Sequence, residues 1–214
     1  MEQQNNNEPI IITVGRQIGS GGRVIAKMLA EEFHCDFYDK EILNLAAKQS
    51  GFSEKFFEQN DEQKGFLKSI FQFHLPFTGG GSTFYDNTFS QESLYKFQSD
   101  AIFEAAKKGN CVFVGRTADY ILRDCKRKVD IFITANLDQR IQRVCQRHQF
   151  DRKTARKYIH DKEEVRATYY NYYTGKTWGH SESYDLCVNS SLLGIEETER
   201  FIVEFIRKRL TIDK

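Results

Sequence analysis

Apolar residues come in five short runs along the chain, and helical patterns separate most of them. The runs cover residues 10–14, 35–38, 111–114, 129–134 and 185–189. Short buried strands that alternate with helices are typical of a parallel sheet covered on both faces. The pattern therefore predicts an α/β fold with a single domain over residues 1–214, in which the polar residues 1–9 form a disordered leader.

Helical spacing of apolar residues sets the expected helices. The first follows from the recurrence of apolar side chains at Val24, Ile25, Met28, Leu29 and Phe33. Further helices are expected over residues 40–49, 91–108, 138–148, 151–172 and 195–210, with a helical turn at 119–122. Residues 76–90 contain three consecutive glycines among aromatic residues and are expected to form a long loop, either a binding flap or a disordered tip.

A glycine-rich loop joins the first predicted strand to the first predicted helix, in the stretch IIITVGRQIGSGGR. Glycines let successive backbone N–H groups point inward, and the helix N-terminus adds its positive dipole end, so this layout is typical of a phosphate cradle. The predicted phosphate-binding residues are Gly19, Ser20, Gly21, Gly22 and Arg23. The alternative is a glycine-rich turn that binds nothing.

The loop matches the P-loop signature G-x-x-x-x-G-K-[ST] only in part. With Gly21 as the second glycine, Arg16 takes the place of the first. Gly22 then stands where the signature has lysine, and Arg23 stands where it has the magnesium-binding hydroxyl. Arg16, Arg23 or an arginine elsewhere would have to supply the missing positive charge.

Ligands of open parallel sheets bind beyond the carboxyl ends of the strands. The glycine loop, Asp39, Arg116 and Asn136 all follow predicted strands and are therefore expected along one edge. Arg116 comes directly after a buried strand and a glycine, and its planar guanidinium suits a phosphate or carboxylate. The alternative for Arg116 is a structural salt bridge to Asp119 or Asp124.

A basic and aromatic region lies toward the C-terminal half. Between residues 126 and 166, twelve Lys and Arg residues stand against six Asp and Glu residues. Arg140, Arg143 and Arg147 share one helix face, and several tyrosines with Trp178 follow. A helical lid over residues 148–178 would neutralise a transferring phosphoryl group and cover a base. The alternative is a solvated helical surface.

Composition excludes several classes of protein. Hydrophobic content of 40% and charged content of 29% indicate a globular protein, and a net charge of +1 gives no global attraction to nucleic acid or anionic lipid. Five cysteines without a C-x-x-C pair predict reduced thiols in a cytoplasmic protein, and the histidines show no metal-ligand spacing. No apolar run reaches bilayer length and no signal peptide is present, so no membrane partner is expected.

The chain resembles the cytidylate kinase-like family, relatives of bacterial cytidylate kinases among the P-loop nucleoside monophosphate kinases. The resemblance covers nearly the whole chain, from residue 10 to about residue 206. The segments that carry it are ITVGRQIGSGGRVIAKMLAEEF, FYDKEIL, VGRTADYILRD, RIQRV, YYNYYTGKTWG and YDLCVNSS. The resemblance implies a three-layer P-loop NTPase fold with five parallel strands. It also implies a nucleoside-monophosphate-binding insertion at residues 50–95 after the second strand, and the lid after the fourth.

The resemblance further implies transfer of the γ-phosphoryl group of ATP, with Mg²⁺, to a nucleoside monophosphate such as CMP or dCMP. The expected acceptor-binding residues are Asp39, Lys40, Arg116 and Asp119, with Asp119 standing in for an aspartate that the family carries where this chain has Thr117. The expected catalytic residues are Arg16, Arg147, Lys162 and Arg166. Mg²⁺ would be held by ATP oxygens and water, with Ser20 or Asp39 as open candidates.

Two other functions stay open at this stage. Loss of the P-loop lysine and hydroxyl is compatible with a non-catalytic, nucleotide-binding regulatory protein of the same fold. An RNA-binding module that uses the Arg- and Tyr-rich helix is the third hypothesis, and near-neutral charge without a recognised RNA motif argues against it. The expected partners are small nucleotides, and the sequence leaves open whether the chain forms a homo-oligomer.

Overall fold

The structure is a computed structural model that describes residues 8–39 and 84–211. Contacts divide the chain into two compact units, one made of Met1–Lys40 and Ile102–Lys214 and the other of Glu41–Ala101. The second unit is described only through the first part of helix α5 (Phe84–Lys108). Lys40, the expected helix at residues 40–49 and most of the expected insertion lie outside the described residues.

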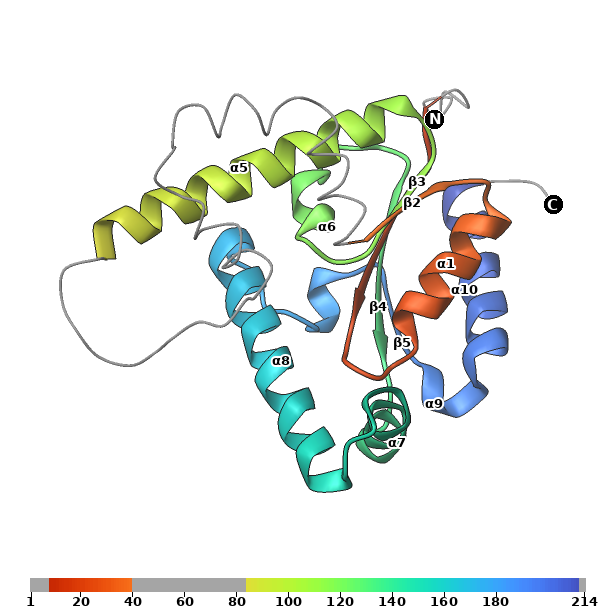
Figure 1. Cartoon of the computed structure of the whole chain (residues 1–214). Helices are drawn as coiled ribbons and strands as arrows, with labels where there is room; N and C mark the ends of the chain where they lie inside the picture. Colours follow the sequence, from red (N-terminus) through yellow and green to blue (C-terminus); the bar gives the residue numbers. More distant parts are fainter. Residues whose placement is uncertain (1–7, 40–83, 212–214) are drawn as a thin grey trace. The chain divides into compact units, whose positions relative to one another are not determined.

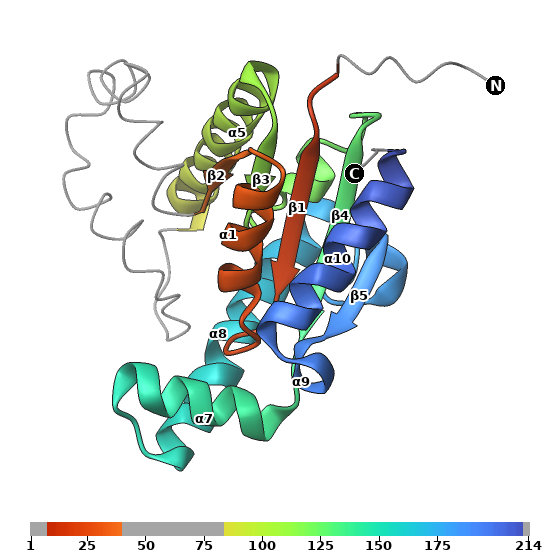
Figure 2. The same cartoon turned by 90° about the vertical axis from the view of Figure 1, so that its right-hand side faces the viewer.

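The first unit contains a five-stranded sheet in which every pairing is parallel. Its order is β2-β3-β1-β4-β5, so the first strand lies in the middle. The strands are β1 (Ile11–Arg16), β2 (Asp36–Tyr38), β3 (Cys111–Phe113), β4 (Lys128–Thr134) and β5 (Leu186–Asn189). Figure 1 shows the sheet nearly edge-on, and Figure 2 shows β1 between β3 and β4. The predicted parallel α/β architecture is confirmed.

Helices cover both faces of this sheet. α1 (Gly22–Glu32) and α10 (Ile195–Leu210) pack on one face, and α6 (Ala118–Ile121) and α8 (Arg152–Thr174) lie on the other (Figure 1). α7 (Leu137–His148) precedes α8, and the short helix α9 (Ser190–Leu193) follows β5. With helices on both faces, β1 and β4 are buried and apolar along most of their length, as a central parallel strand requires.

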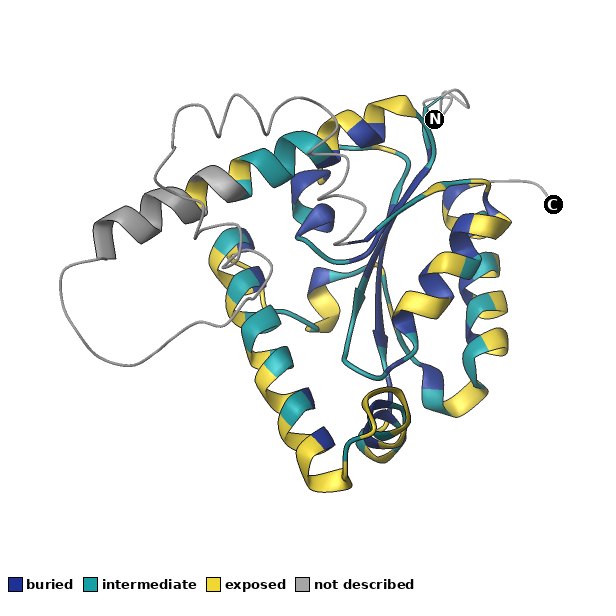
Figure 3. Ribbon diagram, viewed as in Figure 1, coloured by how far each residue is buried: buried dark blue, intermediate teal, exposed yellow. Residues whose placement is uncertain are grey.

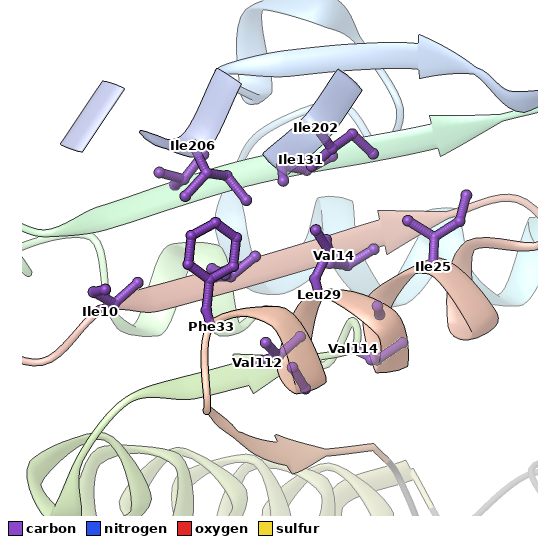
Figure 4. Packing of buried hydrophobic residues seen from close by; sticks show 14 of the residues in the cluster. Ile10, Val14, Ile25, Leu29, Phe33, Val112, Val114, Ile131, Ile202 and Ile206 are labelled. Carbon is purple, nitrogen blue, oxygen red and sulfur yellow. The ribbon is translucent and has the colours of Figure 1, made fainter. Parts of the chain in front are cut away.

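The core lies between the sheet and the α1–α10 pair. Figure 4 shows Ile25 and Leu29 of α1 and Ile202 of α10 packed onto Val14 and Ile131 of the central strands, and all five side chains are fully buried. Burial of side chains of this size contributes about 1.5–3 kcal/mol each. The glycine loop is therefore held between a central strand and a helix that is firmly packed, and its geometry is set by both.

α7 and α8 form a hairpin with its own small apolar cluster. Ile141 and Val144 of α7 pack against Ala155 and Ile159 of α8. Asp151 caps α8 by accepting a hydrogen bond from the Thr154 N–H at 2.8 Å. Figure 3 shows exposed positions in yellow along much of α8, as its polar sequence predicts. The expected helix at residues 151–172 is confirmed to within two residues at its end.

Two elements differ from the sequence prediction. α5 begins at Phe84 instead of at residue 91, so the last part of the expected long loop is helical. No glycine or proline follows Gly81 there, and an established helix extends readily into residues without a helix breaker. β2 was expected to be buried, but it lies at the edge of the sheet and Asp36 is exposed. None of the described helices combines the length and apolar character that crossing a bilayer requires.

Candidate functional site

The loop between β1 and α1 depends on two glycines in the left-handed region. Gly19 has φ 77° and Gly21 has φ 80°. A Cβ on Gly19 would lie 2.7 Å from the carbonyl oxygen of Arg140, and one on Gly21 would lie 2.1 Å from Cδ1 of Ile195. Both the backbone conformation and the close neighbours therefore exclude a side chain at these two positions.

Two backbone N–H groups of this loop are available as hydrogen-bond donors. The Ser20 hydroxyl donates to the Gln17 carbonyl at 2.9 Å and accepts a long hydrogen bond from the Gly22 N–H at 3.3 Å. The N–H groups of Gly19 and Gly21 donate to no acceptor among the described residues. α1 begins at Gly22, so the helix dipole adds to these free donors. This arrangement is compatible with the phosphate cradle that the sequence predicts, and phosphate binding there stays a prediction.

Three arginines from three elements gather beside the loop. Arg16 ends β1, Arg116 follows β3, and Arg166 lies on α8, where its Nη1 donates to the Arg16 carbonyl at 3.1 Å. Burial holds the pKa of Arg16 well below its ordinary value, and the charges of Arg166 and Arg116 lower it further. Burial also lowers the pKa of Arg166, to about 10, although the Glu163 carboxylate opposes that shift. We call these three residues the arginine cluster.

Arg116 is placed by an unusual turn. Gly115, Arg116 and Thr117 have φ of 73°, 61° and 54°, so three consecutive residues are left-handed. Non-glycine residues in this region cost about 1–2 kcal/mol each, and such strain is found at functional sites. Burial lowers the pKa of Arg116, whereas its hydrogen bond with Tyr169 and the charge of Asp39 oppose that shift. The turn thus places a desolvated guanidinium at the end of β3.

Asp39 is the carboxylate whose charge acts on this cluster from the end of β2. Arg23 holds it with Nε at 2.9 Å and Nη2 at 2.5 Å from the same carboxylate oxygen. Asp39 is buried, while the Arg23 side chain is half-exposed. The replacement of the P-loop hydroxyl by arginine therefore brings a cation that binds the neighbouring carboxylate.

The other predicted site residues are placed outside the cluster. The Asp119 carboxylate is buried and accepts a hydrogen bond from the Tyr170 hydroxyl at 2.6 Å. Arg147 is exposed near the end of α7. Lys162 lies over the ring of Tyr158, with its Nζ 5.8 Å from the ring centre. Among the contacts of the described residues, none joins Arg147 or Lys162 to the arginine cluster, so their catalytic roles stay predictions.

Sequence reasoning missed the polar residues that join the α7–α8 hairpin to the loop. Glu163 accepts a hydrogen bond from the Ile18 N–H at 2.9 Å, and it forms an ion pair with Arg140 at 2.5 Å. Arg143 donates to the Gly19 carbonyl at 3.0 Å. The position of Arg140 and Arg143 on one helix face was a sequence signal for these contacts. Glu163 lies among many charged residues, and nothing in the sequence distinguished it from them.

A metal site made of protein side chains is not found in the part of the chain that the structure describes. No group of three His, Cys, Asp or Glu residues there is arranged to hold an ion. Asp39 is bound by Arg23, and position 23 offers no hydroxyl. The loop amides and the cluster fit the phosphates of a nucleotide, and a metal would depend mainly on that nucleotide's oxygens.

Solved structures support the fold. A crystal structure of an uncharacterized protein from Eubacterium ventriosum is 27% identical, has a TM-score of 0.70, and covers 92% of this chain and 98% of its own. TT1252 from Thermus thermophilus is 15% identical with a TM-score of 0.54, and covers 93% of this chain and 98% of its own. Shikimate kinase from Bacteroides thetaiotaomicron is 13% identical with a TM-score of 0.50, over 92% of this chain and 98% of that enzyme. These neighbours and the sheet order confirm the predicted α/β fold with its five-stranded parallel sheet.

Sequence relatives identify the family. A cytidylate kinase from Methanocaldococcus jannaschii is 26% identical over 193 residues, which are 87% of this chain and 92% of that enzyme. A cytidylate kinase from Staphylothermus marinus is 32% identical over 108 residues, which are 50% of this chain and only 60% of that enzyme. The family model described as "Cytidylate kinase-like family" matches residues 11–192. The chain therefore belongs to the cytidylate kinase-like family.

Proposed function

We propose that this protein transfers the γ-phosphoryl group of ATP to a nucleoside monophosphate or a related small acceptor, with CMP and dCMP as the favoured acceptors. Family membership and two relatives named cytidylate kinase support this choice. The acceptor is proposed as a nucleotide because the chain matches the family over most of its length.

One observation carries the proposal: the arginine cluster lies next to free backbone donors of the glycine loop. Repulsion by Arg166 and Arg116 adds to burial in lowering the pKa of Arg16, and repulsion by Arg116 adds to burial in lowering the pKa of Arg166. Because arginine nevertheless stays protonated in proteins, the site favours a bound polyanion. Phosphoryl transfer asks mainly for positioning and charge neutralisation rather than for a covalent protein intermediate. These residues offer both at one edge of the sheet.

Each part of the site has a proposed task. The amides of Gly19, Gly21 and Gly22 hold the donor phosphates, and the cluster neutralises the transferring group. Mg²⁺, when bound to the nucleotide, supplies further neutralisation of phosphate charge. Arg116, with Asp39 beside it, faces the acceptor. Residues 50–95 and the lid at residues 148–178 would complete the acceptor and donor sites.

The proposed reaction also indicates where the protein acts and what it binds. ATP and nucleoside monophosphates are cytoplasmic metabolites, so we place the protein there, with small nucleotides as its partners and without nucleic acid or membrane.

A specific observation favours a second function, a non-catalytic nucleotide-binding regulator. Position 22 is glycine and position 23 is arginine, so the lysine and the hydroxyl of the P-loop are both missing. Such a protein would bind ATP through the same amides without turning it over.

A phosphoryl-transfer screen separates the two functions. The full chain would be incubated with ATP and Mg²⁺ and with each of CMP, dCMP, UMP, AMP and a panel of other small acceptors, and ADP would be measured. We expect ADP formation that depends on the acceptor and is fastest with CMP or dCMP. Tight ATP binding without acceptor-dependent ADP would favour the regulator, and absence of ATP binding would refute both functions.

A further inference from the structure

The side chain of Arg16 begins where a side chain at position 22 would have to pass. A Cβ built on Gly22 lies 2.6 Å from Cβ of Arg16 and 3.1 Å from its Cγ. Cβ atoms in proteins do not come this close, and both contacts are with the rigid base of the arginine. Arg16 and a residue larger than glycine at position 22 therefore exclude each other.

The far end of Arg16 is also matched by a glycine. A Cβ on Gly115 would lie 2.2 Å from Nη1 of Arg16. Gly115 ends the neighbouring strand β3 and has φ 73°, which glycine adopts without strain. The arginine side chain thus runs from the start of α1 to the end of β3, across the mouth of the loop, between two positions that lack side chains.

Within residues 8–39 and 84–211, the guanidinium of Arg16 has no partner of opposite charge at contact distance. Among the described residues it donates no hydrogen bond and forms no ion pair, while its backbone is fixed by pairing with Ile133 and by the hydrogen bond from Arg166. Arg166, Arg116 and Arg23 act on it as like charges, and Asp39 is the opposite charge that acts on it. Asp39 compensates only part of the hydration that such a cation loses, and a bound anion would compensate more.

Resting on the proposed function, we infer that Arg16 brings to the phosphate the positive charge that a P-loop otherwise takes from lysine at position 22. The chain differs from the signature by an arginine at the first glycine and a glycine at the lysine. Under this inference the two differences belong together, because the positive charge has moved from position 22 to position 16. Its substrate class is a nucleoside triphosphate or another polyphosphate. A guanidinium fork can donate to two phosphate oxygens at once, whereas an ammonium acts as a point charge.

The competing interpretation is that Arg16 only fills space between Gly22 and Gly115. Under that interpretation its removal leaves a cavity and lowers stability, with no specific effect on phosphate binding. Under ours, removal of the charge relieves repulsion within the arginine cluster and removes a phosphate contact. The two interpretations therefore predict changes of opposite sign in stability when Arg16 is replaced.

The test uses the full chain, with ATP and inorganic tripolyphosphate as probes, isothermal titration calorimetry for affinity, and thermal unfolding without ligand for stability. We expect Arg16→Met to weaken both probes by about tenfold to a hundredfold, the scale of a charge-assisted contact, without lowering the unfolding temperature. Arg200→Met, which removes an exposed arginine of α10, is the matched control. Equal affinity of Arg16→Met and the wild type would overturn the inference.

An exchange of the two residues keeps the test sharp if a single variant folds poorly. Arg16→Gly should lose affinity because it lacks the charge, and Gly22→Lys should lose affinity and stability because its Cβ meets Arg16. The double variant Arg16→Gly/Gly22→Lys restores the ordinary P-loop spacing and should bind ATP more tightly than either single variant. A double variant no better than the singles would overturn the inference.

These measurements are independent of turnover. A wild type that binds ATP through Arg16 but phosphorylates no acceptor would refute the proposed kinase activity and leave the inference standing. A wild type that is an active kinase with Arg16→Met unchanged in affinity would refute the inference alone. Failure of the wild type to bind either probe would refute both.

Discussion

The Glu163 carboxylate on α8 accepts a hydrogen bond from the backbone N–H of Ile18, 2.9 Å away in the glycine loop. The same carboxylate pairs with Arg140 of α7 at 2.5 Å, and both side chains are largely buried. One acidic side chain thus connects the loop and both helices of the α7–α8 hairpin. Movement of α8 is therefore coupled to the loop that would hold phosphate.

Glu163→Gln should loosen this connection. Arg140 would stay largely buried without its charge partner, so we expect a loss of about 3 kcal/mol in the free energy of unfolding. Urea unfolding measures the loss, and hydrogen exchange should become faster in α8 and in the loop. Glu164→Gln, at the exposed neighbouring position, is the control and should stay within about 0.5 kcal/mol of the wild type. Equal effects of the two variants would show that Glu163 does not hold the hairpin.

Arg116→Ala should separate acceptor binding from donor binding. We expect ATP affinity to stay nearly unchanged and acceptor-dependent turnover to fall by about 2–3 kcal/mol in activation free energy, the scale of a charge-assisted contact. Steady-state kinetics with CMP and calorimetry with ATP provide the two readouts. A variant that keeps its kinetic constants but unfolds at a lower temperature would assign Arg116 a structural role instead.

Gly21→Ala should distort the loop through two effects that can be told apart. The left-handed conformation alone costs alanine about 1–2 kcal/mol, and the new Cβ would also meet Cδ1 of Ile195 at 2.1 Å. We expect lower stability and weaker ATP binding. Ile195→Val removes that Cδ1, so the double variant should regain the steric part of the loss and keep the conformational part. No recovery in the double variant would mean that the clash is relieved elsewhere.

Asp119 gives a prediction for pH. Burial raises the pKa of its carboxyl, while the Tyr170 hydroxyl and the charges of Lys128 and Lys176 oppose the shift. The native carboxyl therefore holds its proton more tightly than the unfolded one, and the contribution to stability is present below the unfolded pKa of about 4 and is lost as pH rises through the native pKa.

Asp119→Asn keeps an acceptor for Tyr170 and removes the titration. Relative to the wild type, this variant should gain stability between pH 4 and pH 7, as followed by urea unfolding across that range. Asp124→Asn removes an exposed carboxyl, and its free energy of unfolding should depend on pH as that of the wild type does. A wild type that gains stability over this range relative to Asp119→Asn would contradict the sign of the shift.

Much of the fold could be predicted because the sheet is central and parallel. β1, β3 and β4 are buried and mostly apolar, so their runs stand out from the sequence without knowledge of their partners. β2 was harder to place correctly because its exposure depends on its position at the sheet edge, which short-range patterns do not record. The start of α5 was missed because a helix can extend through residues of low helical preference.

The candidate site was predictable where chain order alone sets position. Arg116 follows a strand directly, and the carboxyl ends of parallel strands share one edge, so its place was expected. The path of the Arg16 side chain was not predictable. It depends on how the folded chain places Gly22 and Gly115, which have no Cβ, beside that side chain. The contact of Glu163 with Ile18 joins residues far apart in sequence and leaves no local pattern.

The left-handed threonine at position 117 sets a limit on efforts to make this protein resistant to heat. A β-branched residue at φ 54° is unfavourable, and its hydroxyl contacts the carbonyl of the preceding Arg116. Glycine or asparagine there would relieve the strain, and a library selected only for thermal survival would enrich such substitutions. The relaxed turn would no longer fix the direction of Arg116, so selection for heat resistance alone would discard the geometry on which the proposed recognition of the acceptor depends.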